Sequence, residues 1–188
     1  MNDSGSPSFS FDSDVVIRRA RVADAALLHE IAAATFGLAC PPDTTQEDID
    51  AFVAEHLSTQ AFEHYLVDPA RTIFVAQFDG DGAGYTMLAA EDPTDPDVAS
   101  AVRSRPTAEL SKCYVLPGHH GRGVAGALMA ASVDEAGRQG AKSIWLGVNQ
   151  QNERANRFYE KSGFVTVGSK LFRLGDRFED DFVKELTL

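Results

Sequence analysis

The chain has 188 residues, of which 44% are hydrophobic and 24% charged, and its formal net charge is −11. This length and balance predict one soluble globular domain whose core needs no disulfide or metal to fold. The acidic charge argues against a nucleic-acid binder and against a binder of anionic membranes, because phosphates would be repelled. Residues 41–69 hold seven Asp and Glu and no Lys or Arg. The charge serves either solubility alone or the attraction of a cationic small molecule.

The N-terminal residues 1–14 have neither the basic nor the apolar region of a signal peptide, and they predict a disordered lead-in to a single domain over 15–188. The two cysteines, Cys40 and Cys113, lie at no metal-ligand spacing. They therefore indicate free thiols in a reducing cytoplasm. No apolar run of about 18 residues is evident, so we expect no membrane span.

The first half of the domain predicts a strand, three helices and a hairpin. Asp24 is the expected N-cap of the first helix, and Thr44 or Thr45 begins a capping box for the second. The sequence DGDG marks the hairpin turn. These elements are a strand at 15–22, helices at 24–36, 49–57 and 60–67, and strands at 71–78 and 84–91.

The second half predicts a mixed α/β layout. Residues 92–106 form a long, turn-rich excursion before the strand at 108–116. The last strand is a candidate for pairing across a homodimer. The remaining elements are a helix at 123–140, a strand at 142–148, a helix at 152–163 that Asn152 caps, and strands at 164–169 and 178–188.

The sequence GHHGRGVAGALM, residues 118–129, lies between a strand and a helix. Free N–H groups and the positive end of the helix dipole meet at such a turn, so it either binds phosphate or is a tight turn without a ligand. A dinucleotide fingerprint requires a carboxylate about 20 positions on, at the end of the next strand. That strand ends LGVNQ, and the loop also lacks the G-K-[ST] of nucleoside-triphosphate sites.

Two stretches, ELSKCYVLPGHHGRGVAGALM and SIWLGVNQQNERANRFYEKSGF, resemble the GCN5-related N-acetyltransferase (GNAT) superfamily. That family binds the pyrophosphate of acetyl-CoA with an Arg/Gln-x-x-Gly-x-Gly/Ala loop. Residues 120–125 occupy this loop, with His120 at the position of the Arg or Gln. The strong resemblance covers 108–165 and a weaker one nearly the whole chain. Within the superfamily the chain is most similar to bacterial spermidine/spermine N-acetyltransferases.

The resemblance implies a GNAT fold, with a mixed, largely antiparallel, twisted sheet of about seven strands flanked by about four or five helices. It implies an acyltransferase that moves an acetyl group directly from acetyl-CoA to a primary amine, with no metal. The implied cofactor-binding residues are Tyr114, Val115, His120, Gly121, Arg122, Gly123, Val124, Ala125, Gly126, Asn152 and Tyr159.

The resemblance also implies catalytic roles. Tyr159 is the general acid for the departing thiolate, with packing beside Phe158 as the alternative role. Glu109 is our candidate base through a water molecule, or else a solvated carboxylate at the strand end. We expect backbone contacts from Tyr114 and Val115 to the pantetheine arm, and an oxyanion donor from one of them. Asn152 matches a residue that contacts this arm, and its alternative role is a plain helix cap.

The acceptor is less well defined by the sequence. Phe36 and residues 37–45 correspond to the acceptor-facing helices of the family, and the acidic residues of 43–55 either meet a polyamine or form a solvated helix face. A polyamine is the leading hypothesis. The alternatives are an acetyltransferase for peptide or protein amino groups and a non-catalytic CoA-binding sensor. We interpret Cys113 as a small apolar core residue rather than a covalent carrier of the acetyl group. We interpret His119 and His120 as loop residues that line the phosphate site rather than as metal ligands.

Overall fold

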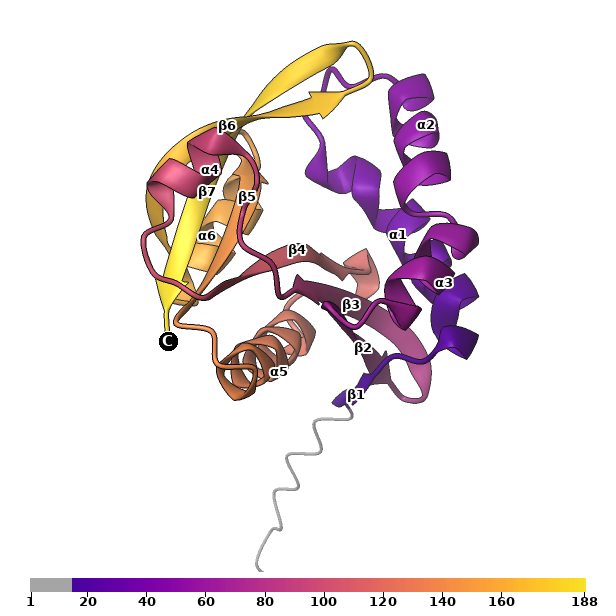
Figure 1. Ribbon diagram of the computed structural model, residues 1–188. Helices are drawn as coiled ribbons and strands as arrows, with labels where there is room; N and C mark the ends of the chain where they lie inside the picture. Colours follow the sequence, from indigo (N-terminus) through magenta and orange to yellow (C-terminus); the bar gives the residue numbers. More distant parts are fainter. Residues whose placement is uncertain (1–14) are drawn as a thin grey trace, which may run out of the picture.

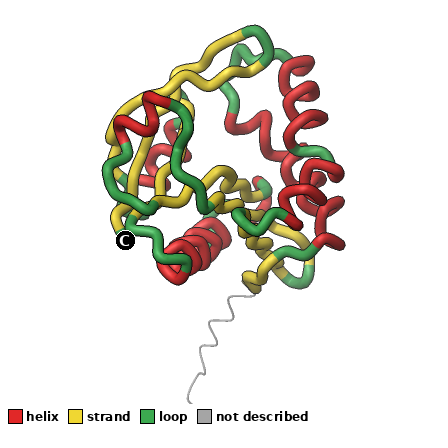
Figure 2. Tube along the Cα trace, viewed as in Figure 1, coloured by secondary structure: helices red, strands yellow, loops and turns green. Residues whose placement is uncertain are grey.

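The computed structural model describes residues 15–188, so the lead-in predicted over 1–14 lies outside the described residues. Within that part, seven strands form one sheet in the order β1-β2-β3-β4-β5-β7-β6, flanked by six α-helices (Figures 1 and 2). The strands are β1 (Val15–Arg19), β2 (Arg71–Phe78), β3 (Asp81–Ala89), β4 (Thr107–Val115), β5 (Ser143–Asn149), β6 (Val165–Leu174) and β7 (Arg177–Thr187). The helices are α1 (Ala25–Ala39), α2 (Gln46–His56), α3 (Thr59–Val67), α4 (Pro96–Ala101), α5 (Val124–Arg138) and α6 (Glu153–Lys161).

The sheet divides into two parts where β4 and β5 separate. The strands β1 to β4 pair antiparallel, as do β5, β7 and β6. The parallel pairing of β4 with β5 is confined to Thr107–Glu109 against Ser143–Trp145. Beyond this point the second half of β4 has a free backbone edge that faces β5. The loops that follow both strands lie at this opening, where open α/β sheets commonly bind ligands.

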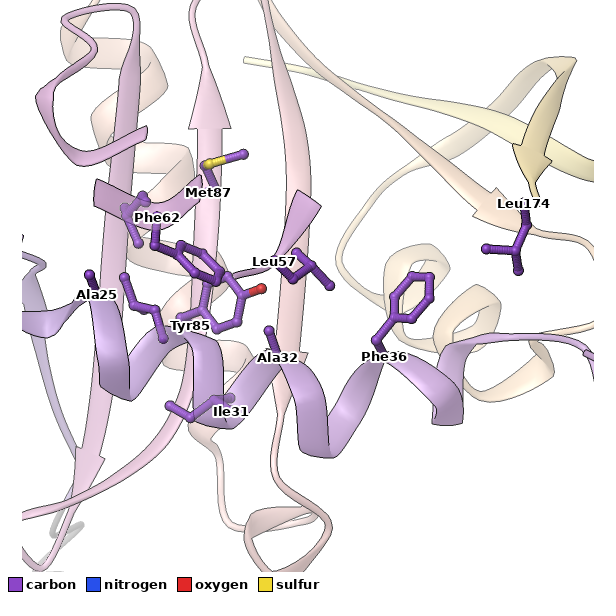
Figure 3. Close-up of a cluster of buried hydrophobic side chains, with 11 residues drawn as sticks. Ala25, Ile31, Ala32, Phe36, Leu57, Phe62, Tyr85, Met87 and Leu174 are labelled. Carbon is purple, nitrogen blue, oxygen red and sulfur yellow. The ribbon is translucent and has the colours of Figure 1, made fainter. Parts of the chain in front are cut away.

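Helices cover both faces of the first part of the sheet. On one face, Ile31 of α1 and Phe62 of α3 pack around Tyr85 of β3, and the rings of Phe62 and Tyr85 lie 5.4 Å apart (Figure 3). On the other face, Leu128 of α5 packs against Phe74 of β2. This sandwich holds β4 and the start of α5 in fixed positions beside the opening.

The segment 22–39 has the length and apolar composition of a membrane span, which our sequence reasoning did not single out. It consists of a short 3-10 turn, Val22–Asp24, followed by α1. Leu28, Ile31 and Phe36 on one side of α1 are buried in the hydrophobic core. One side of the segment is therefore packed in the core of the domain, although only 33% of the segment is buried.

Three helix N-caps were predicted, and all three residues stand at the predicted positions, two of them with a capping hydrogen bond from the side chain. Thr45 and Asn152 each accept a hydrogen bond, at 3.1 Å, from the amide three residues further on. Asp24 stands at the predicted N-cap position of α1, but its side chain makes no capping hydrogen bond there, because the residue also ends the 3-10 turn. Its carboxylate instead accepts a hydrogen bond from the Arg21 amide at 2.7 Å and forms an ion pair with Arg18 at 2.8 Å.

The excursion predicted over 92–106 contains the short helix α4. The Asp95 carboxylate caps this helix by accepting hydrogen bonds from two amides of its first turn. Val98 and Val102 are buried against Trp145 on the second part of the sheet. An N-cap and two apolar contacts thus order a segment whose composition suggested only turns.

The C-terminal hairpin of β6 and β7 is longer than predicted and reaches the N-terminal helices. Strand β6 continues to Leu174, beyond the predicted end at residue 169. After the turn, Arg177 donates hydrogen bonds to the carbonyl and the carboxylate of Asp43, in the segment between α1 and α2. The hairpin therefore bridges the two parts of the molecule on the side of α2 (Figure 1).

The pairing of β7 bears on the predicted dimer contact. Strand β7 lies between β5 and β6 and pairs with both. Over residues 181–185 both of its edges are therefore occupied within the chain, and this stretch cannot pair with a second copy as the sequence had suggested. At this end of the sheet β6 is the edge strand.

Candidate active site

A cavity of about 580 Å³ occupies the opening between β4 and β5. It is lined on one side by residues 119–121 and 123–126 and the start of α6, and on the other by α1, α2 and the β6–β7 hairpin. With the exception of Arg122, the predicted site residues all line it: Glu109, Tyr114, Val115, His120, Gly121, Gly123, Val124, Ala125, Gly126, Asn152 and Tyr159.

Strand alternation decides which backbone groups of β4 face the cavity. The Leu116 amide donates to a carbonyl of β3 at 2.9 Å. Because backbone direction alternates along a strand, the backbone of Tyr114 also points toward β3, whereas Cys113 and Val115 point to the open edge. The Val115 carbonyl agrees with this, since it accepts a hydrogen bond from His120. The backbone contact expected from Tyr114 is thus directed into the sheet, and only its ring lines the cavity.

His120 joins the end of β4 to the start of α6. Its Nδ1 lies 2.8 Å from Nη1 of Arg154, and its Nε2 lies 2.9 Å from the Val115 carbonyl. A guanidinium can only donate, so Nδ1 accepts and the ring proton is assigned to Nε2, which donates to the carbonyl. Arg154 thereby brings a positive charge to the loop. Sequence reasoning missed Arg154, which is an ordinary residue of a matched helix.

The glycine-rich loop leaves room beside unsatisfied donors. Gly121 and Gly123 have φ of 77° and 81°, a conformation that side-chain-bearing residues rarely adopt. No side chain caps the first turn of α5 within the described chain. A Cβ at Gly126 would meet no protein atom within 4 Å. Free amides at a helix N-terminus, next to space that the protein leaves open, fit a pyrophosphate.

Arg122 is placed differently from the other predicted residues. Its guanidinium lies 5.0 Å from the centre of the Phe78 ring, on β2. The side chain is therefore turned away from the cavity, and Arg154 supplies the cationic group at the loop.

Tyr159 both packs in the core and lines the cavity. Its ring lies 5.5 Å from that of Phe158 and 5.8 Å from that of Phe164. Burial, followed by the neighbouring Cys113, raises the pKa of the Tyr159 phenol well above its usual range. The phenol therefore holds its proton at neutral pH, as a proton donor must. Burial also raises the pKa of the Cys113 thiol to about 12, so this group is neutral.

Two asparagines fix the junction of β5 and α6. Asn152 uses its side-chain oxygen as the helix cap, which leaves its NH₂ group for another partner. Asn156 donates to the carbonyls of Asn149 and Asn152, both at 3.0 Å. The cap and a ligand contact by Asn152 are therefore geometrically compatible.

Glu109 is the last residue of β4 that pairs with β5, so its side chain lies where the sheet opens. Burial raises the pKa of its carboxyl, against the opposing effect of Lys170 and Lys112. Burial also lowers the pKa of Lys112 to about 8, and its Nζ lies 5.2 Å from the centre of the Tyr65 ring. A carboxylate in this setting accepts a proton more readily than one in water.

The opposite side of the cavity combines aromatic rings with charged groups. The rings of Phe36 and Phe52 stack at 4.3 Å, and Phe172 lies 5.6 Å from Phe52. None of the acidic residues of 43–55 lines the cavity. The carboxylates and the amine on this side come from the C-terminal hairpin, and sequence reasoning missed them: Lys170, Glu179 and Asp181.

Metal binding was not expected at the histidines of the loop, and the Nδ1 atom of His119 is buried without a hydrogen-bond partner in residues 15–188. His120 binds Val115 and Arg154, as described above, and the His119 ring lies 5.3 Å from that of Phe78. Within residues 15–188, no cluster of three or more His, Cys, Asp or Glu side chains has the arrangement of a metal site.

Comparison with known proteins adds to this geometry. Residues 31–164 match the model of the Acetyltransferase (GNAT) family. The chain is 48% identical over 160 residues to an uncharacterised N-acetyltransferase of Mycobacterium tuberculosis (strain ATCC 25618 / H37Rv), a match that covers 85% of this chain and 95% of that relative.

Two solved structures share the architecture. The PaiA N-acetyltransferase from Thermoplasma acidophilum, in complex with coenzyme A, aligns with a TM-score of 0.74 at 20% identity over 93% of this chain and 99% of its own. The spermidine/spermine N-acetyltransferase SpeG from Vibrio cholerae aligns with a TM-score of 0.64 at 20% identity, over 94% of this chain and 95% of its own. At these identities the likeness is one of fold.

Proposed function

The chain belongs to the acetyltransferase (GNAT) family and is an N-acetyltransferase that uses acetyl-CoA, and we propose that its acceptor is the primary amine of a small cationic molecule, with polyamines as the leading class. The observation that carries this proposal is the set of carboxylates in the cavity, Glu109, Glu179 and Asp181, beside aromatic rings. Carboxylates and aromatic faces are the groups that bind alkylammonium ions. The net charge of −11 attracts such ions at longer range.

The hairpin contact favours a small molecule over a peptide segment. A protein acetyltransferase needs an open groove through which an extended chain can pass. Here Arg177 of the β6–β7 hairpin binds Asp43, and the backbone at Gly175 lies against the Asp48 side chain. These contacts cross the acceptor side, so we infer that the acceptor enters as a compact molecule.

We propose that the loop and the first turn of α5 hold the donor. The amides of Gly123, Val124, Ala125 and Gly126 bind the pyrophosphate, with Arg154 beside them. The backbone edge at Cys113 and Val115 and the NH₂ group of Asn152 bind the pantetheine arm. His120 keeps the strand end and α6 in register through its two hydrogen bonds.

The reaction then needs few groups. Acetyl-CoA, when bound, supplies an acetyl group on a thioester. Glu109 accepts, through a water molecule, the proton that the ammonium must lose before it can attack. An N–H of Cys113 or Val115 donates to the oxygen on which negative charge develops. Tyr159 donates its phenolic proton to the departing sulfur.

We also infer a reducing compartment such as the cytoplasm, because Cys40 and Cys113 are both free thiols. A homodimer formed by strand pairing would use an edge strand, β1 or β6, and analytical ultracentrifugation tests whether a dimer forms.

A thiol-release assay tests the proposed acceptor class. Acetyl-CoA is supplied with spermidine, spermine, aminoglycosides, amino acids or short peptides, one at a time. We expect the highest kcat/KM for a polyamine. A peptide as the best substrate would support the alternative of a protein acetyltransferase. Binding of acetyl-CoA without release for any amine would support the non-catalytic sensor.

A further inference from the structure

Asp181 is a buried carboxylate that the reaction described above does not use. It lies on β7 opposite Asn149 of β5, and its side chain lines the cavity. The residue is only 7% exposed. Its neighbour Asp180 is exposed on the other face of the strand, as alternation requires.

The Asp181 carboxylate has no hydrogen bond or ion pair with any group in residues 15–188. The other two buried carboxylates of the hairpin differ, because Arg177 lies 3.5 Å from Glu179 and Glu185 accepts hydrogen bonds from the amides of residues 103 and 104. The oxygens of Asp181 are open to the cavity, where a cationic group of a ligand can pair with them. Burial raises the pKa of Asp181 to about 6, so the group is still ionised at pH 7.5.

Lys170 shares this corner of the cavity with Asp181. A Cβ at Gly147 of β5 would lie 2.9 Å from the Lys170 Cε and 3.4 Å from Oδ2 of Asp181. Glycine at this position therefore lets both side chains extend over β5 into the cavity. The Lys170 amine is more than 4 Å from the carboxylate oxygens, and it lowers the pKa of both Asp181 and Glu109. It is a resident cation near two carboxylates, not a fixed partner of either.

Glu109 and Asp181 lie on different strands on the two sides of the opening. Glu109 is beside the point where β4 and β5 part, and Asp181 is level with the end of β5. Phe172 and the Phe36–Phe52 stack supply apolar surface on the same side of the cavity. Two separated carboxylates with apolar surface nearby match two ammonium groups joined by a methylene chain.

We propose that Asp181 binds the second ammonium group of a diamine acceptor, the one that is not acetylated, and that Lys170 is displaced from this corner when the diamine binds. The inference rests on the proposed function and names the acceptor more closely: an aliphatic amine with at least two ammonium groups. Asp181 is a specificity-determining residue, and Glu109 serves the reacting amine.

Equilibrium binding to the CoA-bound full chain tests this without turnover. Isothermal titration calorimetry compares 1,5-diaminopentane with 1-aminopentane, which has the same chain length but one ammonium group. Wild-type protein is expected to bind the diamine at least 10-fold more tightly. In Asp181→Asn this preference falls to less than about 3-fold. The loss is expected because a charge-assisted hydrogen bond typically contributes about tenfold or more in affinity.

The control is Asp180→Asn, which removes the same charge from the adjacent, outward-facing residue and is expected to leave both affinities within about 2-fold. Lys170→Gln is a second variant, expected to tighten diamine binding at least 3-fold. Persistence of the preference in Asp181→Asn, absence of the preference in wild type, or weaker diamine binding in Lys170→Gln overturns the proposal.

Thiol release separates this inference from the proposed function. If amines are acetylated without a preference for diamines, the role proposed for Asp181 is contradicted, whereas the proposal that the chain acetylates amines is supported. Diamine binding that depends on Asp181 but is not followed by release supports the site and contradicts the enzymatic proposal.

Discussion

Tyr159 shows how one residue can serve both packing and chemistry. Tyr159→Phe keeps the ring between Phe158 and Phe164 and removes only the hydroxyl. We expect kcat to fall by about 10²-fold or more, with little change in the KM for acetyl-CoA, because only proton donation is lost. Steady-state thiol release with a good acceptor measures both constants.

The pH profile adds a second check on Tyr159. Because the pKa of the phenol is raised well above its usual range, wild-type activity should show no alkaline limb from this group between about pH 7 and 9. Unchanged turnover in Tyr159→Phe would show that another group, or water, protonates the leaving sulfur.

Asp181 is expected to lower the stability of the protein at neutral pH. Its pKa is raised by burial from 3.8 to about 6 in the folded state. The folded protein therefore binds this proton at a higher pH than the unfolded chain does, and stability rises as the pH falls through 6. Asp181→Asn should raise the free energy of unfolding at pH 7.5 by about 1–3 kcal/mol, with a smaller gain at pH 5.

Urea denaturation at the two pH values measures this difference, with Asp180→Asn expected within about 0.5 kcal/mol of wild type. A loss of stability in Asp181→Asn would mean that the carboxylate supports the fold rather than awaiting a ligand. A gain would place it among groups that are retained for function at a cost in stability.

At the scale of elements, a substitution in the first turn of α5 is expected to remove ligand binding without lowering the stability of the fold. Gly126 is a helical residue with open space beside it, so leucine there should raise helix stability by up to about 1 kcal/mol. The same side chain would enter the space left for the pyrophosphate. Gly126→Leu should therefore keep or raise the melting temperature without ligand and lose the increase that CoA produces in wild type.

Gly137→Leu is the matched control for this helix. Gly137 also lies in α5 and has no atom within 4 Å of an added Cβ, but it is not among the residues that line the cavity. The variant should gain similar helix stability and respond fully to CoA in thermal denaturation. A full CoA response in Gly126→Leu would argue against phosphate binding at this turn.

The elements also show which features could be read from the sequence. The segment from β4 to α6 was predicted closely, because its periodicity, caps and glycine loop are local and contiguous. The direction of the Tyr114 backbone was not, because neighbouring residues of a strand point their backbone groups to opposite edges. The pairing of β4 with β3 decides which of Tyr114 and Val115 faces the open edge, and that pairing joins segments that the local pattern does not connect.

The acceptor side was the part that local patterns missed. Asp181 and Lys170 reach the cavity only because β7 pairs between β5 and β6 and because Gly147 leaves room above β5. These are contacts between segments far apart in the chain, so no spacing in the sequence records them. The acidic residues of 43–55, which the sequence did offer, lie outside the cavity.

The whole molecule presents its two substrates with different electrostatic conditions. In the proposed arrangement the anionic donor meets local amides and Arg154, whereas the cationic acceptor approaches a chain with a net charge of −11. The split sheet then lets each substrate occupy its own side of one cavity. Local hydrogen bonds must therefore offset a repulsive field for the donor, while the field itself helps the acceptor.

Ionic strength distinguishes this attraction from a charge that serves solubility alone. At about 0.1 M salt the screening length is about 10 Å, so added salt weakens long-range attraction between the chain and a diamine. Raising NaCl from about 20 to 200 mM should increase the KM for 1,5-diaminopentane several-fold, leave kcat nearly constant, and affect 1-aminopentane less. The KM for acetyl-CoA should change little, because screened repulsion and weakened contacts with Arg154 oppose each other. A diamine KM that is independent of salt in thiol-release assays would assign the acidic charge to solubility, and recognition to the cavity alone.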